Sequence, residues 1–413
     1  MSFVNPLMVT ERVQVRLWDE NDAPSEWSEK AFFELGLLEE NDWQASWIAG
    51  DYKAKRSEHY PVDCLRKRFA VESVKKARLY ATACGMYALE LNGQKVGGAV
   101  LTPGATDFTK RVQVQTYDVT ALLCAGENEL TAELAGGWFK SYLLSDGRTA
   151  RYGNEAKLLL QLEITDVSGT VTVIGTDGTW EWSNDGPIRF AENKAGERID
   201  ARMLPSYAGR ARSVKYPARR VASNNVSMLE HEQFPAKLLT TPAGKTVLDF
   251  GQNIAGFLSF ELTANAGDTL TLYFGELLEN GEFTQRNINP NKKHDKPFQK
   301  LEYTCKDGRN RYKTKFAIFG FQYVLVEASV PVKPEQFTAV AVYSDMENTL
   351  SFQSDHALLN RFVEATRWST KNNSADVPTD CPTRERVGWT GDAQIFYNTA
   401  AYLFDYARMC QYI

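Results

Sequence analysis

Apolar and polar residues alternate in short segments along most of this chain. The clearest segments are 12–18, 77–83, 86–91, 112–117, 158–164, 171–174, 258–262, 269–274 and 322–327. Successive side chains of a strand point to opposite faces, so a period of two predicts strands with one buried face. Turn residues such as Asn92-Gly93 and Gly267-Asp268 separate the segments. Short strands at this spacing are typical of antiparallel sandwiches.

The pattern changes after about Asp345. Asp355 can cap a helix whose apolar residues follow at helical spacing, and this helix should end near 371–373. A loop rich in Pro and Gly then runs from Pro378 to Gly391, and Asp392 begins a second helical stretch that continues to the last residues. The apolar positions of the two helices are Leu358, Leu359, Phe362 and Val363, then Ile395, Phe396, Thr399, Tyr402 and Leu403. We therefore predict two helices on either side of a loop over 374–391.

These patterns predict a mainly β chain with four parts. Residues 1–42 contain a strand, a turn and a strand, and two strands do not make an independently stable sheet. They either dock on the next domain or belong to a larger sandwich. Residues 43–213 and 214–345 each predict an antiparallel β-sandwich, and residues 346–413 are long enough for about two helices.

The composition is that of an ordinary globular protein, with 43% apolar and 24% charged residues. Lys and Arg number 47 and Asp and Glu 52, so the net charge of −5 leaves no basic surface for nucleic acid. No run of 18 or more apolar residues is present, which argues against a membrane span. The first residues show no basic segment followed by a long apolar one, so we expect no signal peptide and a cytoplasmic protein.

The cysteines and histidines do not predict a metal centre. The six cysteines are far apart, none is in a CxxC pair, and the four histidines are also scattered. Zinc sites need these ligands at close, regular spacing. We therefore expect reduced thiols, as in a cytosolic protein.

The most informative segment is Asp380–Asp392, which holds three acidic residues and two arginines among Pro, Gly and Trp. Gly and Pro favour a tight loop that can direct several carboxylates into one pocket. Trp389 offers an apolar wall, and desolvation by such a wall raises the pKa of a neighbouring carboxyl. The alternative is a polar loop whose acids are simply paired with the arginines. A thiol nucleophile at Cys381 is disfavoured because no His lies near it in the sequence.

The same segment resembles the signature of bacterial α-L-rhamnosidases of glycoside hydrolase family 78. The matching residues are Asp380-Cys381-Pro382, Arg384-Glu385-Arg386 and Gly388-Trp389-Thr390-Gly391-Asp392. Further segments extend the resemblance over nearly the whole chain: Trp27-Ser28, Asp42-Trp43, Leu91-Asn92-Gly93, Leu101-Thr102-Pro103-Gly104, and Asp249-Phe250-Gly251-Gln252-Asn253 with Gly256. The resemblance implies a fibronectin-III-like remnant over 1–42, a jelly-roll domain over 43–213, a second β-sandwich over 214–345, and the first helices of an (α/α)₆ barrel over 346–413.

The resemblance also implies an activity, the inverting hydrolysis of terminal α-L-rhamnosyl groups from glycosides. Glu385 matches the general acid of the family. Asp380 and Asp392 match acids that bind rhamnose and support the general acid, and Trp389 matches a pocket aromatic. Arg384 and Arg386 either orient these acids or contact the sugar. The family's catalytic base lies further along the chain than this segment, so we expect residues 1–413 alone not to hydrolyse an aryl rhamnoside.

Several further expectations concern ligands and partners. The resemblance allows a calcium-dependent rhamnose site in the jelly-roll domain, near Gly153-Asn154 and the segment 186–202 with Glu192, although ordinary turn chemistry explains these residues as well. No other cofactor is expected. Glu276 and Glu279 are read as solvated, His294 as a residue of an exposed loop, and His356 as near a helix start. The alternative function is a non-catalytic carbohydrate-binding or scaffold fragment, and a homodimer is compatible with either.

Overall fold

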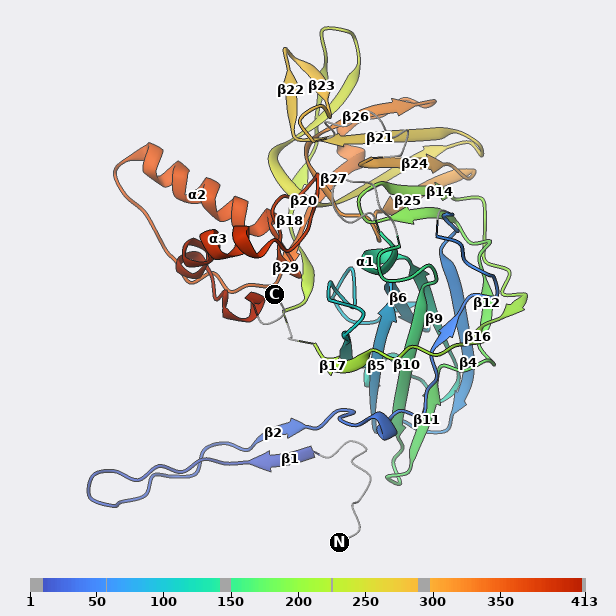
Figure 1. Ribbon diagram of the computed structural model, residues 1–413, viewed down its shortest axis with the longest axis vertical. Helices are drawn as coiled ribbons and strands as arrows, with labels where there is room; N and C mark the ends of the chain where they lie inside the picture. The colour runs from blue at the N-terminus through green and yellow to red at the C-terminus, as the bar shows by residue number, and fades with distance from the viewer. Residues whose placement is uncertain (1–9, 57, 142–149, 224–225, 289–297, 411–413) are drawn as a thin grey trace.

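Two β-rich bodies form the bulk of the molecule, and a two-stranded arm and a pair of helices project from them (Figure 1). The computed structural model describes residues 10–56, 58–141, 150–223, 226–288 and 298–410. The arm consists of β1 (Thr10–Val13) and β2 (Ala31–Glu34). The chain is therefore mainly β with a helical end, and the predicted fold class is confirmed.

The first β-rich body is a sandwich of two sheets. Its strands are β3 (Ile48–Ala49), β4 (Asp63–Val71), β5 (Lys76–Cys84), β6 (Met86–Leu91), β7 (Gln94–Lys95), β8 (Arg111–Asp118), β9 (Gly126–Ala135), β10 (Lys157–Thr165), β11 (Val171–Gly175), β12 (Glu181–Ser183), β15 (Gly209–Arg210), β16 (Arg212–Ser213) and β17 (Arg219–Ala222). One sheet has the order β16-β3-β10-β5-β8-β17, with β11 beside β10, and the other β15-β12-β4-β9-β6-β7. The short helix α1 (Gly137–Lys140) follows β9.

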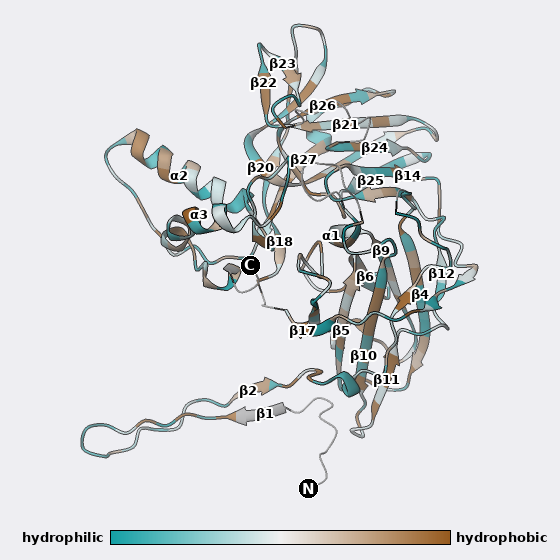
Figure 2. Cartoon of the chain, in the orientation of Figure 1, coloured by the Kyte–Doolittle hydropathy of each residue, from teal (hydrophilic) through white to brown (hydrophobic). Residues whose placement is uncertain are grey.

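Alternating hydrophobicity builds the core of this sandwich, as the brown and teal segments along its strands show (Figure 2). Leu65, Leu79, Leu89 and Leu130 lie in one apolar cluster and are at most 3% exposed. Side chains of period two place such residues on one face of each strand, and burying them contributes about 25 cal/mol per Å² of apolar surface. The strands predicted over 77–83, 86–91, 112–117, 158–164 and 171–174 are confirmed.

The second β-rich body has ten strands that are hydrogen-bonded into one sheet. It contains β13 (Ile188–Glu192), β14 (Gly196–Asp200), β18 (Met228–Pro235), β19 (Lys237–Thr240), β20 (Thr246–Ala264), β21 (Thr269–Gly275), β24 (Lys300–Thr304), β25 (Gly308–Lys313), β26 (Phe319–Ala328) and β27 (Phe337–Ser344). The order is β13-β14-β24-β21-β26-β20-β27-β18, and β19 and β25 also pair with β20. A small hairpin, β22 (Leu277–Glu279) and β23 (Glu282–Thr284), stands beside it.

Strand membership does not follow the boundary that we placed between residues 213 and 214. The hairpin β13–β14 precedes this boundary but joins the second sheet, where β14 pairs in parallel with β24. β17 follows the boundary but joins the first sandwich, where it pairs in parallel with β8. Each body therefore contains strands from the residue range that we assigned to the other. Both sheets that receive these strands include a parallel pair.

A long strand, β20, organises the second sheet. Its first part pairs with β19 and β26, its last part pairs with β25 and β27, and the register shifts between Asp249 and Ile254. An irregularity of this kind bends a strand and changes its twist. The segment Asp249–Asn253, which the sequence marked as part of the resemblance, is thus the place where β20 leaves β19, whereas β26 pairs with β20 on both sides of it.

Two helices form the C-terminal part, α2 (Ala357–Asn372) and α3 (Thr390–Leu403). The short strands β28 (Ser374–Ala375) and β29 (Val377–Pro378) lie between them. The cap of α2 is His356, whose Nδ1 accepts a hydrogen bond from the Leu359 N–H at 3.3 Å, so the expected cap at Asp355 is wrong by one position. The second helix ends earlier than predicted and gives way to a 3₁₀ turn over 407–410.

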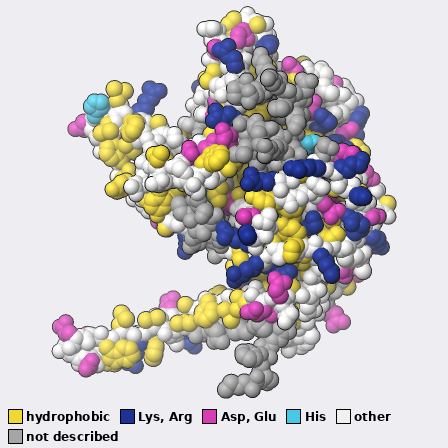
Figure 3. Space-filling view, viewed as in Figure 1, with side chains coloured by type: hydrophobic (Ala, Val, Ile, Leu, Met, Phe, Trp, Pro, Cys, Tyr) yellow, Lys and Arg dark blue, Asp and Glu magenta, His cyan; other side chains and the backbone are white. Residues whose placement is uncertain are grey.

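Apolar side chains remain exposed on both projecting parts of the molecule (Figure 3). Phe362 on α2 is 67% exposed and Ile395 on α3 is 85% exposed, while Leu403 of the predicted stripe is buried. On the arm, Leu17, Trp18 and several neighbours are also largely exposed. In the part of the chain that the structure describes, no helix is long and apolar enough to cross a membrane.

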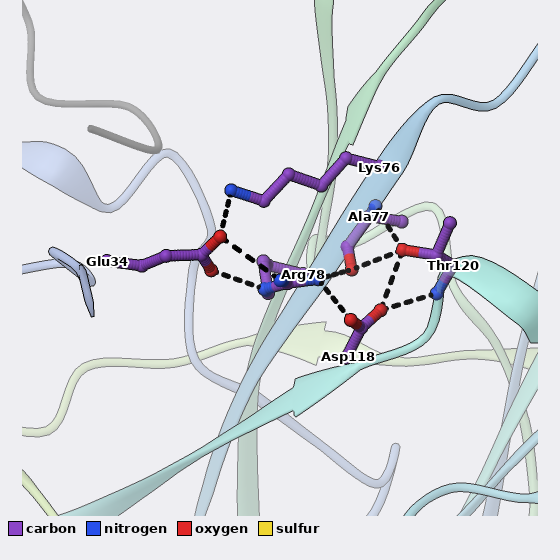
Figure 4. A network of polar contacts seen from close by, with 6 residues as sticks. All are labelled: Glu34, Lys76, Ala77, Arg78, Asp118 and Thr120. Atoms are coloured by element: carbon purple, nitrogen blue, oxygen red, sulfur yellow. Dashed lines mark hydrogen bonds and ion pairs between the residues drawn. The ribbon is translucent and has the colours of Figure 1, made fainter. Parts of the chain in front are cut away.

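An ion-pair network attaches the arm to the first sandwich (Figure 4). Glu34 at the end of β2 accepts hydrogen bonds from the Arg78 guanidinium, at 2.7 and 3.2 Å, and pairs with Lys76. Arg78 also pairs with Asp118 at 2.8 Å, and Thr120 joins the cluster through the Ala77 N–H. The arm is thus docked on the first sandwich at one end.

The pairing of β20 with β27 gives a test of the second sheet. A Cβ at Gly256 would collide with the Val340 carbonyl oxygen. Gly256→Ala should therefore destabilise the fold by about 1–3 kcal/mol, as overpacking does. A thermal melt checks this, with Gly98→Ala as the control because its added Cβ would meet nothing nearer than 3.7 Å. Equal melting temperatures for the two variants would contradict the tight pairing.

Candidate active site

The loop between α2 and α3 is closed on itself by Asp380. The backbone N–H of Asp380 donates to the Val387 carbonyl at 3.2 Å, and the Val387 N–H donates to Asp380 Oδ1 at 3.1 Å. At the start of the loop, the Thr379 N–H donates to the Asn373 carbonyl at 2.8 Å. These bonds give residues 380–387 the shape of a closed turn, as the Pro and Gly content predicted.

A pocket lies between this loop and α3. Asp380 and Asp392 both line it, so the structure brings two of the predicted acids to one wall. The other lining residues are Ser369, Asn373, Pro378, Thr379, Ala393, Ile395, Phe396, Tyr397 and Tyr406. Carboxylates beside aromatic and apolar side chains suit a ligand with both hydroxyl and methyl groups. Asp392 also lies in the first turn of α3, where the helix dipole favours a negative charge.

Glu385 lies outside the lining of this pocket, in a polar setting of its own. Its Oε2 accepts a hydrogen bond from Trp389 Nε1 at 2.9 Å, and its Oε1 pairs with Arg384 Nε at 3.2 Å. The side chain keeps 18% of its surface exposed. Trp389 thus meets the acid through its N–H group, and the expected apolar wall is wrong for this contact. Arg384 thus contacts Glu385 rather than the lining of the pocket.

Arg386 points in the opposite direction, into the protein. It is 4% exposed, and its guanidinium donates to the carbonyls of Pro382 at 2.8 Å and Asn193 at 2.6 Å and to Gln299 Oε1 at 2.7 Å. Burial lowers the pKa of this guanidinium to about 10, which leaves it protonated near neutral pH. This placement does not fit the expected contact with sugar, because the guanidinium faces the second sheet.

The loop that contains Thr383 and Arg386 packs against the second sheet. Gln299 is fully buried, and its Oε1 accepts from the Gly320 N–H at 2.9 Å as well as from Arg386. A Cβ at Gly320 would collide with the Thr383 methyl group and lie 2.8 Å from the Pro382 carbonyl oxygen. Backbone and side chain of the loop therefore approach β26 as closely as a glycine permits.

Asp376 ties the beginning of the loop to the first sandwich. Its Oδ2 accepts from the Ala105 N–H at 2.6 Å and from Gln113 Nε2 at 3.4 Å, and its own N–H donates to Ser344 Oγ at 2.9 Å. Burial raises the pKa of Asp376 to about 7. Gln113 Oε1 has no partner among the described residues. If the Gln113 amide is flipped, this oxygen accepts a hydrogen bond from the protonated carboxyl of Asp376.

Asn372 makes a third attachment, at the end of α2. Its side chain accepts from the Ala255 N–H at 2.9 Å and donates to the Asn253 carbonyl at 3.0 Å. The amide thus completes the backbone bonds of β20 just beyond its irregular segment. Sequence reasoning missed Asn372, Asp376, Gln299 and Asn193. Contacts with a distant part of the chain leave no local sequence pattern. The only local signal is the polar stretch over 372–376, at the end of the helix.

The expected calcium region has the contacts of an ordinary turn. Glu192 is buried and accepts from the backbone N–H groups of Lys194 at 2.9 Å and Ala195 at 2.6 Å, and from the Ser141 hydroxyl. Asn154 lines a nearby cavity with Glu192 and Asp63. In the described residues, no group of three or more His, Cys, Asp or Glu side chains is arranged for a metal ion.

The remaining expectations have mixed outcomes. Glu276 is half-buried and accepts from Asn253 at 3.2 Å and Asn287 at 3.4 Å, so the solvated reading is wrong for it. Glu279 is exposed and pairs with Arg286. His294 lies outside the described residues. Among the described side chains, five cysteines have free thiols, including Cys381, whose sulfur accepts from the Glu385 N–H at 3.2 Å.

Four family models match successive parts of the chain. They are described as a Rha78A-like N-terminal immunoglobulin domain over 8–39, an α-L-rhamnosidase N-terminal domain over 72–239, a bacterial α-L-rhamnosidase concanavalin-like domain over 239–343, and a bacterial α-L-rhamnosidase 6 hairpin glycosidase domain over 347–413. The first of these names an immunoglobulin domain where we expected a fibronectin-III-like one, and both are β-sandwiches. The matches define a class of chain in which β-domains precede a six-hairpin glycosidase domain.

Curated relatives and solved structures agree with this class. An α-L-rhamnosidase of Alteromonas sp. (strain LOR) is 35% identical over 95% of this chain and 45% of its own length. The α-L-rhamnosidase structure from Aspergillus terreus has a TM-score of 0.89 at 32% identity, over 97% of this chain and 48% of that one. A Streptomyces avermitilis α-L-rhamnosidase complexed with L-rhamnose has the same fold, with a TM-score of 0.88 at 24% identity, over 97% and 56% of the two chains.

The chain belongs to the α-L-rhamnosidase family, glycoside hydrolase family 78. It spans about half the length of the curated relatives that it matches. The resemblance read from residues 380–392 is thereby confirmed.

The buried carboxyl of Asp376 predicts a pH dependence of stability. Its pKa is raised from 3.8 to about 7, so ionisation opposes folding, and stability falls as the pH rises from about 4 through 7. Asp376→Asn should remove this contribution, and its stability relative to the wild type should rise across that window, by an amount on the order of 2–4 kcal/mol. Urea titrations at several pH values measure it.

The control for this titration is Asp166→Asn. Asp166 is exposed, and hydrogen bonding by Ser168 lowers its pKa, so its substitution should bring no relative gain at higher pH. If the free energies of unfolding of wild type and Asp376→Asn keep a constant difference from pH 4 to pH 8, Asp376 is not a titrating buried acid.

Proposed function

We propose that this chain is part of an α-L-rhamnosidase that hydrolyses terminal α-L-rhamnosyl groups with inversion, and that Glu385 is its general acid. The observation that carries this is the arrangement of one loop. Asp380 and Asp392 line one pocket, and Glu385 follows Asp380 closely on the same closed turn. Family membership supports the substrate class. A rhamnosylated glycoside is the proposed partner, and a cytoplasmic location and a homodimer stay part of the proposal.

The chemistry of inversion fits these roles. One carboxylic acid protonates the glycosidic oxygen while an ionised carboxylate activates water on the other face of the sugar, at about 6.5–9.5 Å from the first. Glu385 is partly exposed, so its carboxyl is accessible from solvent, and Arg384 and Trp389 hold it in one orientation. Asp380 and Asp392 accept hydrogen bonds from hydroxyl groups of rhamnose. We assign no residue of this chain to the base.

The apolar lining of the pocket supports a deoxysugar. Phe396 and Tyr397 lie on the same wall as Asp392, so a ligand there meets a carboxylate and an aromatic face together. Rhamnose offers vicinal hydroxyls for the acids and a methyl group for the rings. Trp389 is 43% exposed and donates its N–H to Glu385, and in this proposal its ring contacts the departing group.

Substitution of the acid gives the test of this function. In a complete α-L-rhamnosidase that carries these residues, Glu385→Gln should keep the fold and lose the proton donor, with a rate loss of about 10²–10⁴-fold. A leaving group of low pKa needs little protonation. The kcat/KM for an activated aryl rhamnoside should therefore fall much less than that for a disaccharide.

Asp380→Asn and Asp392→Asn serve as the comparison in the same assay. If these acids hold sugar hydroxyls, both substrates should lose activity by similar factors, because the leaving group is not involved. A leaving-group dependence in one of these variants, with equal losses in Glu385→Gln, would assign the acid to another carboxylate. Binding of L-rhamnose by a wild-type protein without any hydrolysis would favour the non-catalytic carbohydrate-binding alternative.

A further inference from the structure

The loop that carries Glu385 is held at two points by buried ionisable side chains whose hydrogen-bond partners are neutral. Asp376 stands at its beginning and Arg386 next to the acid itself. Asp376 is 7% exposed and Arg386 is 4% exposed. Burying an ionisable side chain is costly unless its hydrogen bonds are satisfied, so such groups are rare where the chain has no need of them.

The two side chains contact different bodies of the molecule. Asp376 bonds to Ala105 and Gln113 of the first sandwich, while Arg386 bonds to Asn193 and Gln299 of the second sheet. Between them, Thr383 rests against Gly320. The position of the loop relative to both bodies is thus set by these contacts and by Asn372, and not by α2 and α3 alone.

The guanidinium of Arg386 is matched to its surroundings. Three of its nitrogens donate to three acceptors in different directions, one in its own loop and two in the second sheet. An ammonium group is a compact charge on a flexible stem and cannot reproduce this planar set of donors. The backbone at Arg386 is in the left-handed region, with φ 54°, which turns this side chain inward while Glu385 faces outward.

We infer that Asp376 and Arg386 are positioning residues for Glu385: they clamp the acid loop between the two β-rich bodies and so hold the carboxyl in its hydrogen bond with Trp389. The inference rests on the proposed role of Glu385 as the acid. It makes the β-rich bodies part of the catalytic apparatus, because they supply every partner of the two buried side chains except the Pro382 carbonyl.

The experiment follows the indole N–H of Trp389 in the 413-residue chain by ¹⁵N–¹H NMR. Trp389→Phe assigns the signal among the nine tryptophans. In the wild type, this signal should lie away from the position of a solvated indole, since Glu385 Oε2 accepts the hydrogen bond of this N–H. Asp376→Ala and Arg386→Met should move the signal to the position of a solvated indole. Asp376→Asn should leave the signal in place, because an amide oxygen can still accept from the Ala105 N–H.

Two further variants keep the test decisive. Arg309→Met is the matched control, because Arg309 of β25 is exposed and pairs with Glu261 of β20. It should leave the Trp389 signal unchanged. Arg386→Lys covers the case in which Arg386→Met fails to fold, and it should broaden or shift the signal although the charge is kept.

The inference is overturned if Asp376→Ala or Arg386→Lys lowers the melting temperature but leaves the Trp389 signal at its wild-type position. The two residues would then be structural only. This readout needs no substrate, so it separates the inference from the proposed function. A displaced Trp389 signal in both positioning variants supports the inference even if the hydrolysis assay assigns the acid to another carboxylate.

Discussion

This structure depends on one constraint: where the helical part packs against the β-rich bodies, every buried polar group needs a hydrogen-bond partner. Arg386, Asp376 and Asn372 all reach out of the helical part and are completed by backbone or amide groups of the β-rich bodies. A buried group that loses its partner costs about 1–3 kcal/mol, and more if it is charged. The helices cannot slide over the sheets without breaking several such bonds together, so the contact has one favoured register.

The second sheet can provide these partners because β20 changes neighbours along its length. At the irregular segment 249–254 the strand leaves β19, and beyond it the strand pairs with β27 and β25. The backbone groups of Asn253 and Ala255 are free there to bond to Asn372. A regular central strand would have no such groups available, because neighbouring strands would use them. The irregular segment therefore fixes the end of α2, and with it the wall of the pocket that contains Asn373 and Ser369.

The sequence predicted local structure well and long-range partnership poorly. Alternation over 77–83 or 269–274 is set by burial on one face of a strand, and those strands are present. The assignment of 188–200 to the second sheet depends on pairing with 300–304, more than a hundred residues away, which no periodicity records. The loop over 380–392 was recognisable from its residues, but the sequence did not show that Arg384 and Arg386 differ in burial. Only the packing against Asn193 and Gln299 distinguishes the buried arginine from the exposed one.

Because the two neighbouring arginines differ in this way, one short loop both contacts Glu385 and packs against the second sheet. Arg384 is exposed and faces Glu385, whereas Arg386 faces the interior, and the left-handed backbone at Arg386 reverses the direction between them. For a residue with a Cβ this conformation costs about 1–2 kcal/mol. The three hydrogen bonds of the Arg386 guanidinium offset part of that cost and part of the cost of burying the charge. The left-handed backbone at Arg386 is therefore maintained only while the guanidinium makes these hydrogen bonds. The direction in which Glu385 points depends on the same contacts.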